Sequence, residues 1–211
     1  YLAMETLADM QAAFEAAFQL VFHLTHLLGR SECGQADSDE QACLRLLTPL
    51  AKLWTGKLAV DIASECCEAF GGAGYIENTG IPQLLRDAQV YPIWEGTSNV
   101  LALDTLRALG KTGVGPILHS VERWLQVRQD SPLPEALATA ASDIRGSLLD
   151  ATRWLETHRD DSSRLQAGAR ALAFSLARAV AAALLWQEGE TAYLSHPQEQ
   201  LAGGQTAEEL K

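Results

Sequence analysis

Positive charge is scarce in this sequence. Its 211 residues include 16 lysines and arginines against 27 aspartates and glutamates, which gives a net charge of −11. The deficit extends over both halves, with −7 over residues 1–111 and −4 over residues 112–211. A protein that neutralises nucleic-acid phosphates needs surplus lysine and arginine, and an anionic membrane surface attracts polybasic segments. The charge therefore argues against nucleic acid as a partner and against membrane association.

Cysteines are few as well: Cys33, Cys43, Cys66 and Cys67. No two of them form a C-x-x-C pair, so the sequence offers no zinc motif and no metal site is expected. Cys66 and Cys67 are neighbours that point about 100° apart on a helix, which disfavours a disulfide between them. Reduced thiols in an intracellular protein are the expectation.

Long apolar runs and an apolar leader are also missing. The longest apolar stretch, residues 172–186, contains Ser175 and Arg178 and is too short to span a bilayer. The chain opens YLAMETLADM, without the apolar core of a signal peptide, so a secreted protein is not expected. Because position 1 is not methionine, we expect a piece of a longer chain.

Helix-forming residues are what the sequence has in abundance. It contains 33 alanines and 33 leucines, the types with the strongest helix propensity, beside an ordinary 16 glycines and 7 prolines. This composition predicts an all-α fold, a helical bundle, rather than a β-sandwich or a barrel.

Apolar residues recur every three or four positions along most of the chain, which is the period of an amphipathic helix. The pattern predicts a first helix that ends near Gly29, a loop over 31–40, and a second helix up to Gly71 that either kinks or starts at Pro49. Further elements are predicted at 82–88 (short helix), 90–92 (extended link), 95–109, 117–128, 137–155 and 165–183 (helices), and 198–211 (a polar tail that frays). Glycines and a proline at 110–116 mark a break, so two units are predicted, 1–112 and 113–211.

Glycines cluster in the segment C-E-A-F-G-G-A-G-Y-I, residues 67–76. Glycine allows a positive φ angle or the close approach of another group to the backbone. Without other information, a helix cap with a tight turn is the favoured explanation of the cluster. No Lys-Ser/Thr follows the glycines, so the segment is not a P-loop.

A carboxylate stands out in the segment L-L-R-D-A-Q-V-Y-P-I-W-E-G-T-S-N-V, residues 84–100. Glu95 follows an apolar run and precedes a predicted helix start, where desolvation would raise its pKa towards that of a general base. Interaction with the helix dipole is the alternative. Arg86 and Asp87 are expected to form a structural ion pair, and Thr97 and Ser98 either cap the helix or donate to a cofactor.

Three motifs together resemble the signatures of the acyl-CoA dehydrogenase family: A-F-G-G-A-G-Y at 69–75, L-L-R-D-A-Q at 84–89 and I-W-E-G-T-S-N at 93–99. Their order and separation are similar to those in the C-terminal helical domain of that family, and the resemblance covers residues 1–110. The run T-P-L-A-K-L-W at 48–54, with Trp94 and Asn99, is most similar to a branch that includes the alkylation-response relatives. That branch carries an additional helical C-terminal region.

The resemblance implies a chemistry and a set of site residues. In the family, a glutamate removes the α-proton of an acyl-CoA thioester while the β-hydride passes to N5 of FAD. Glu95 matches this base, and its backbone N–H would bond the thioester carbonyl. The implied residues are Trp94, Glu95 and Gly96 at the substrate, Gly71 and Gly72 at the FAD of a neighbouring subunit, and Thr97 and Asn99 near the pyrophosphate and ribityl of FAD.

The sequence departs from the family pattern in three respects. Glu68 stands where the family usually has glutamine, and Asn99 replaces the common glutamine, one methylene longer. The N-terminal helical domain and the middle β-domain of the family are not in this sequence. The chain alone is therefore expected to bind FAD weakly or not at all, and to be inactive.

We therefore expect the C-terminal part of an FAD-dependent acyl-CoA dehydrogenase with Glu95 as base. The alternative is a non-catalytic relative whose helical domain serves oligomerisation or partner binding. Residues 113–211 are expected to pack on the core domain or on another subunit of a homo-oligomer, since the apolar stretch at 172–186 lacks the basic face of a membrane-surface helix. By resemblance to the family, we expect a mitochondrial location if the source is eukaryotic and a cytoplasmic location if it is bacterial.

Overall fold

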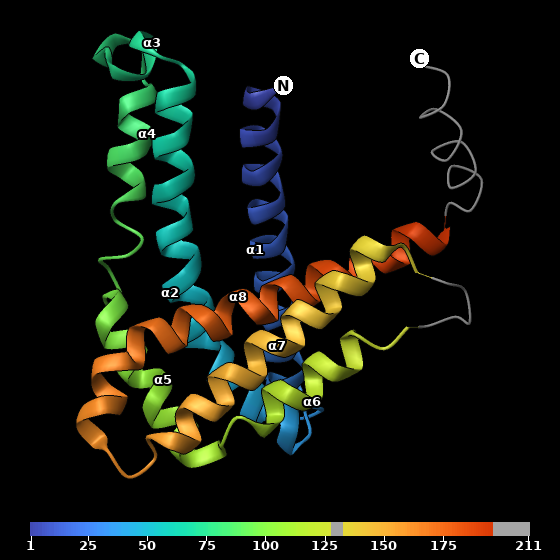
Figure 1. Ribbon diagram of the computed structural model, residues 1–211. Helices are drawn as coiled ribbons and strands as arrows, with labels where there is room; N and C mark the ends of the chain where they lie inside the picture. The colour runs from blue at the N-terminus through green and yellow to red at the C-terminus, as the bar shows by residue number, and fades with distance from the viewer. Residues whose placement is uncertain (128–132, 196–211) are drawn as a thin grey trace.

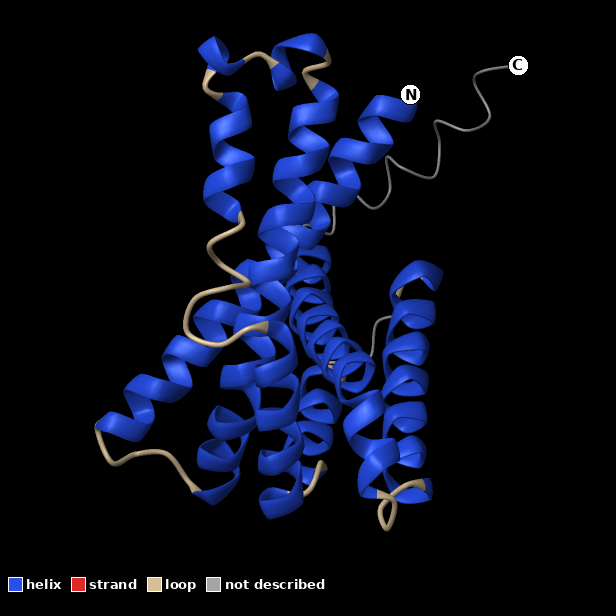
Figure 2. Cartoon of the chain, turned by 90° about the vertical axis from the view of Figure 1, so that its left-hand side faces the viewer, coloured by secondary structure: helices blue, strands red, loops and turns tan. Residues whose placement is uncertain are grey.

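Helices make up the regular structure of the chain. The computed structural model describes residues 1–127 and 133–195 (Figure 1), and within these ranges there is no strand (Figure 2). The elements are α1 (Leu2–Glu32), α2 (Ser38–Ala69), α3 (Gly72–Tyr75), a 3-10 turn η1 (Glu77–Thr79), α4 (Ile81–Ala88), α5 (Ser98–Thr112), α6 (Gly115–Trp124), α7 (Glu135–Thr157) and α8 (Ser162–Ser195). The predicted all-α fold is confirmed. The predicted tail at 198–211 lies outside the described residues.

The core is organised around α8, which runs across the other helices and packs against α1, α2, α5, α6 and α7 (Figure 1). Its inward face is rich in small side chains, and the buried alanines are Ala169, Ala173, Ala177, Ala179, Ala181 and Ala183. Leu172, Leu176 and Val180 fill the space between them. Both halves of the sequence therefore contribute to one apolar core.

The length of α8 overturns the argument that its apolar stretch is too short for a bilayer. The helix has 34 residues, and an 18-residue window of mean hydropathy 1.5 is long and apolar enough for a span by length and composition. In this structure 56% of that window is buried inside the protein. A core helix of a globular domain passes the same test, so the window is weak support for a membrane span.

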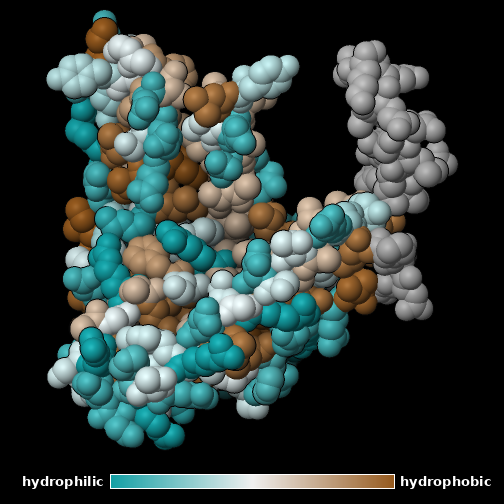
Figure 3. All heavy atoms as spheres, in the orientation of Figure 1, coloured by the Kyte–Doolittle hydropathy of each residue, from teal (hydrophilic) through white to brown (hydrophobic). Residues whose placement is uncertain are grey.

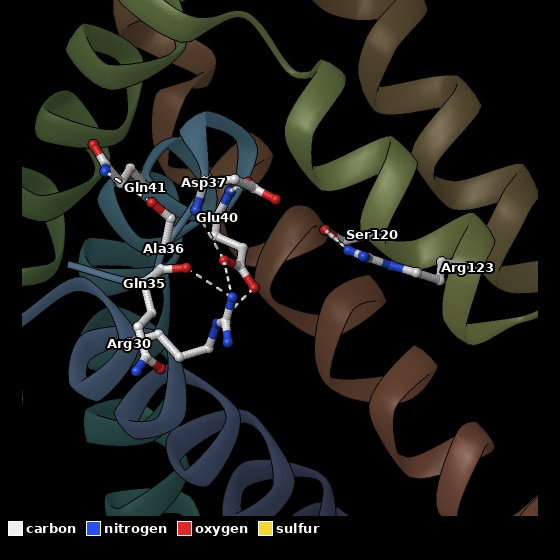
Figure 4. Close-up of polar contacts among 8 residues, drawn as sticks. All are labelled: Arg30, Gln35, Ala36, Asp37, Glu40, Gln41, Ser120 and Arg123. Carbon is white, nitrogen blue, oxygen red and sulfur yellow. Dashed lines mark hydrogen bonds and ion pairs between the residues drawn. The ribbon is translucent and has the colours of Figure 1, made fainter. Parts of the chain in front are cut away.

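A polar cluster joins α1 to α2 (Figure 4). Arg30 donates from Nε and Nη2 to the two carboxylate oxygens of Glu40, both at 2.9 Å, and from Nη2 to the Gln35 carbonyl oxygen. Asp37 and Glu40 form a reciprocal capping box at the start of α2. The hydrogen bond from Arg30 holds the pKa of Glu40 below its usual range. The prediction that α1 ends at Gly29 is wrong, because the helix continues to Glu32 before this turn.

Other predicted boundaries also shift. Pro49 lies inside a continuous α2, so no helix starts there. Residues 89–95 form consecutive turns rather than the extended link predicted at 90–92, and α5 begins at Ser98 rather than at Glu95. The second helix ends at Ala69, and Gly71 separates it from the single turn of α3.

Much of α1 presents apolar side chains to solvent. Its buried residues are Ala16, Leu20 and Leu27, whereas most of the predicted apolar stripe points outward. The large exposed residues are Leu2, Met4, Leu7, Phe14, Phe18, Val21, Phe22 and Leu28. In the space-filling view, hydrophobic side chains also gather along the upright pair α2 and α4 (Figure 3). Helix α1 thus has two apolar faces. One packs against the rest of this chain, and the other is exposed to solvent.

His23 lies on α1 where that helix meets α6 and α8. Its ring meets the ring of Trp124 edge-on at 4.8 Å, and it lines a pocket of about 320 Å³ with Leu184 and Gln187. The pKa of His23 is lowered from 6.5 to about 4, mainly by burial and in addition by the nearby His26 and Arg123. His23 is therefore neutral in the folded protein at neutral pH.

We expect stability to fall as the pH is lowered from 6.5 towards 4, because the unfolded chain binds a proton at His23 that the folded chain does not. The free energy of unfolding should drop by roughly 2 kcal/mol across this window. Urea unfolding of wild type and of His23→Gln at several pH values between 7 and 4.5 measures the effect. His23→Gln should flatten the dependence, whereas His26→Gln should retain most of it because burial is the main cause. Equal slopes for wild type and His23→Gln would contradict this account.

Candidate functional site

The site is built on the turns between α4 and α5. The chain leaves α4 through hydrogen bonds from Tyr91 N–H to the Ala88 carbonyl and from Ile93 and Trp94 N–H to the Val90 carbonyl, at 3.0–3.1 Å. Pro92 is buried beneath these turns. Because the backbone folds back on itself here, the aromatic side chains of Tyr91 and Trp94 remain largely exposed, at 60% and 70%.

Glu95 occupies the strained end of these turns. Its φ angle is 57°, and within the described residues it is the only non-glycine residue with a positive φ. Gly96 follows with a φ of 107°. A side chain in this left-handed region costs about 1–2 kcal/mol, and such strain is concentrated at functional sites. The Glu95 side chain is exposed, and no backbone carbonyl of the described residues accepts its N–H.

Glu95 and Trp94 lie at the edge of a pocket of about 400 Å³ between α2 and the turns. The remaining lining residues are Lys52, Thr55, Gly56, Ala59, Val90 and Tyr91. The pocket has apolar walls with one carboxylate and one ammonium group. This arrangement suits an apolar substrate with a single reacting polar group.

Helix α2 supports the turns through two residues that the sequence patterns did not single out. Lys52 donates a short hydrogen bond from Nζ to the Gly96 carbonyl oxygen. Gly56 lies against the turn, since a Cβ at this position would be 3.2 Å from the carbonyl carbon and oxygen of Tyr91. A glycine within an otherwise good helix sequence was the available signal for this close approach.

The glycine-rich segment lies at the other end of α2. Gly71 has a φ of 56°, and a Cβ built there or at Gly72 would meet no atom within 4 Å. Gly74 differs, because its Cβ would lie 1.8 Å from the Cys67 carbonyl oxygen. The interpretation as a helix cap with a tight turn therefore explains Gly71 and Gly74. This chain gives no steric reason for glycine at position 72.

A second pocket, of about 510 Å³, opens beside these glycines. Gly71, Gly74 and the exposed Glu68 line it. Arg86 also lines it and pairs with Glu77 through two hydrogen bonds of 2.8 and 2.9 Å. The predicted pairing of Arg86 with Asp87 is therefore wrong. Of the two predicted cofactor glycines, Gly71 lines this pocket, whereas the predicted base Glu95 lines the other one.

The start of α5 brings together the remaining predicted residues. Thr97 is the N-cap residue, but its side chain makes no cap hydrogen bond, and Ser98 is buried. Asn99 accepts a hydrogen bond at its Oδ1 from Nη1 of Arg170, at 3.0 Å. Arg170 belongs to α8, so the second half of the chain reaches a predicted cofactor residue. The sequence patterns did not predict this contact.

Metal chemistry has no support from the described ranges, which hold no group of three or more histidine, cysteine or acidic residues placed to bind an ion. The four cysteines are free, and burial raises the pKa of the Cys43 thiol.

Sequence models of two families match the chain. The one described as "Acyl-CoA dehydrogenase, C-terminal domain" covers residues 2–110. The chain belongs to the acyl-CoA dehydrogenase family. The one described as "Acyl-CoA dehydrogenase 11 C-terminal domain-like" covers residues 118–202. The predicted resemblance to the branch with a helical extension is thereby confirmed.

Individual members of the acyl-CoA dehydrogenase family are similar over most of this chain. Acyl-CoA dehydrogenase family member 11 of Caenorhabditis elegans is 41% identical over 186 residues, which is 85% of this chain and 30% of that protein. The putative acyl-CoA dehydrogenase AidB of Escherichia coli is 34% identical over 146 residues, covering 68% and 26%. The crystal structure of C. elegans ACDH-11 in complex with C11-CoA superposes with a TM-score of 0.83 at 38% identity, covering 90% of this chain and 32% of that one. The chain thus spans about a third of the length of these relatives.

The strain at Glu95 predicts that Glu95→Gly stabilises the domain by up to about 1 kcal/mol, because glycine adopts a positive φ without steric cost. Glu95→Ala keeps a Cβ and should give no such gain. Chemical denaturation of the three proteins measures the difference. An equal gain in both variants would assign the effect to loss of the carboxylate rather than to the backbone.

The contact from α2 predicts that Lys52→Met destabilises the protein by about 1 kcal/mol, because the Gly96 carbonyl loses a charged donor. Hydrogen exchange at the backbone amides of Gly96 and Thr97 should become faster. Lys57→Met removes a lysine one turn further along α2 that makes no side-chain hydrogen bond in the described residues, and should leave both measurements unchanged. Unchanged exchange in Lys52→Met would show that the lysine does not hold the turn.

Proposed function

We propose that the chain forms the C-terminal catalytic part of an enzyme that introduces a double bond next to the carbonyl of an acyl-CoA thioester, with Glu95 as the base. The observation that carries this proposal is the strained Glu95, with its exposed carboxylate at the edge of an apolar pocket and its backbone N–H without a carbonyl acceptor. Family membership supplies the reaction class. A solved relative that contains an acyl-CoA molecule supports the substrate class.

Glu95 would act with two of its own groups. Its carboxylate would take the α-proton, and its N–H would donate to the thioester oxygen, where charge develops as that proton leaves. Lys52 and Gly56 hold the backbone that orients both groups. Trp94 and Gly96 complete the substrate end, with Trp94 as an apolar wall and Gly96 as the residue that permits the turn.

FAD is the cofactor that this proposal requires, and several residues fit it. Gly72 leaves open space at the start of α3, and the Thr97 hydroxyl is not used as a cap. The amide nitrogen of Asn99 makes no hydrogen bond in the described residues, since the contact with Arg170 uses its oxygen. When bound, FAD would accept the β-hydride, while the residues of this chain would place and deprotonate the substrate.

Association with further polypeptide follows from the exposed side of α1. Phe14, Phe18 and Phe22 form a row with ring centroids 6.3 and 4.3 Å apart, and each is about half exposed. An apolar row of this kind is typical of a surface that another chain or domain covers. We propose a homo-oligomer, located in mitochondria if the source is eukaryotic and in the cytoplasm if it is bacterial. The same row keeps open the alternative of a non-catalytic relative that serves assembly.

Glu95→Gln is the direct test. In the complete polypeptide it should reduce acyl-CoA dehydrogenation by about 10²–10⁴-fold, since proton transfer to a positioned base contributes this much. FAD should stay bound, because the amide has nearly the same shape. Turnover with an artificial electron acceptor and the visible absorbance of the flavin measure the two effects.

Glu65→Gln is the matched control, because it changes an exposed glutamate of α2 outside both pockets and should retain full activity. Normal turnover of Glu95→Gln would exclude Glu95 as the base. A wild-type polypeptide that neither retains nor takes up flavin would instead favour the non-catalytic relative.

A further inference from the structure

A groove of about 640 Å³ runs between α7 and α8. Helix α7 lies alongside α8 (Figure 1), and α8 is its only extensive neighbour among the described helices. The buried residues on the floor of the groove are Ile144, Ala151, Leu172 and Ala179. Short, exposed side chains stand at its sides: Ser147, Ala171 and Ser175. Because the distance between packed helices depends on the side chains at the contact, another helix can approach this groove closely.

The two helices are antiparallel, and contacts near both ends fix their register. At one end, Nε1 of Trp186 donates to the Leu137 carbonyl oxygen at 2.7 Å. At the other end, a Cβ on Gly168 would lie 2.3 Å from the ring of Trp154. In this register, residues 143–150 in the middle of α7 lie opposite residues 172–179 of α8.

The two rims of the groove carry opposite charges. Asp143 and Asp150 are two turns apart on the α7 rim, about 10 Å along the helix axis. Arg178 stands on the α8 rim, and its guanidinium carbon is 5.7 Å from the ring centroid of Phe174. All three charged side chains are exposed, and Arg178 forms no ion pair with a carboxylate of the described residues. Asp150 has one loose partner, the exposed Arg153 at 3.7 Å on its own helix.

This distribution of charge makes the groove complementary to itself. If a second copy covers the groove with a two-fold axis parallel to it, α7 of each copy lies on α8 of the other. Asp143 and Asp150 of one copy then face Arg178 of the other, and symmetry repeats this attraction. An axis across the groove would instead set α7 against α7 and carboxylates against carboxylates. The charges therefore favour one of the two face-to-face arrangements.

We propose that the groove between α7 and α8 binds the same groove of a second copy of this chain. The two helical hairpins would form an antiparallel four-helix bundle, in which the short side chains allow close packing and the charged rims set the orientation. This interface goes beyond the proposed function, which rests on Glu95 and on the exposed row of α1. It holds or fails independently of the chemistry at Glu95.

The test is the mass of the complete polypeptide in solution, measured by light scattering over a range of concentrations. Arg178→Glu makes both rims acidic, and Asp143→Lys combined with Asp150→Lys makes both basic. Each variant should weaken association through this groove about a hundredfold or more and halve the mass at micromolar concentration. Arg164→Glu makes the same charge change in the first turn of α8, outside the groove, and should keep the mass of wild type.

Mixing the two charge variants separates a contact between copies from an effect within one copy. In a mixed pair, the acidic α7 rim of one copy faces Arg178 of the other, and the lysines face the introduced glutamate. The mixture should therefore recover the mass that each variant loses alone. A structural defect of either variant would not be repaired by mixing.

Three results would overturn the proposal: a monomeric wild type, a wild-type mass in both charge variants, or a mixture that does not reassociate. If the groove instead takes a small apolar molecule or another protein, the charge variants leave the mass unchanged. If Arg178→Glu does not fold, the lysine variant decides. Its mass should fall, and mixing it with wild type should restore part of the mass, because one of the two contacts is then attractive. None of these measurements depends on flavin or on turnover, so a failure of the proposed function leaves the test intact.

Discussion

The close approach of α8 to its neighbours is the constraint on which the rest of the structure depends. Alanines on its inward face let the backbones of adjacent helices come near, and leucines fill the remaining space. Helices α7 and α8 also approach closely at Gly168, where a Cβ would lie 2.3 Å from the ring of Trp154 on α7. Trp186 closes the other end through a hydrogen bond of 2.7 Å from Nε1 to the Leu137 carbonyl. Because α8 contacts helices from both halves, it fixes the position of α2, which lines the candidate pocket, and of α5, which begins directly after the turns that line its other side.

The geometry of Glu95 follows from that packing. Its left-handed backbone costs about 1–2 kcal/mol, which contacts elsewhere must offset. The compensating contacts come from α2, through the Lys52 ammonium and the close approach at Gly56. Since α2 is itself anchored in the core by α8, the backbone conformation at Glu95 depends on the whole bundle. The proposed role of Glu95 as a base would need such rigid support, because small displacements of a catalytic group cost much of its effect.

Hydrophobic periodicity predicted where the helices form, but not which of their apolar faces are buried. The 3.6-residue period identified α1, but α1 has two apolar faces, and only tertiary packing decides that Leu20 and Leu27 are buried while Phe14 and Phe18 are exposed. Gly29 failed as a stop signal because the capping box at Asp37 and the Arg30–Glu40 pair set the turn three residues later. Among the site residues, the motif around Glu95 was visible in the sequence. Its left-handed φ and its support from α2 were not, because they depend on contacts between residues more than 30 positions apart.

The contact between Asn99 and Arg170 links the two halves of the chain structurally. The glycine-rich break near residue 112 suggests separate units, yet the apolar core is continuous across it. In addition, Arg170 of the second half donates a hydrogen bond to Asn99 of the first half. Asn99 is one methylene shorter than glutamine, and in this structure its oxygen is occupied by a guanidinium. The helix that stabilises the fold thus also places a guanidinium group against Asn99, in the first turn of α5. A polypeptide that ends near residue 112 would therefore lose both this contact at the start of α5 and the helix around which the core is organised.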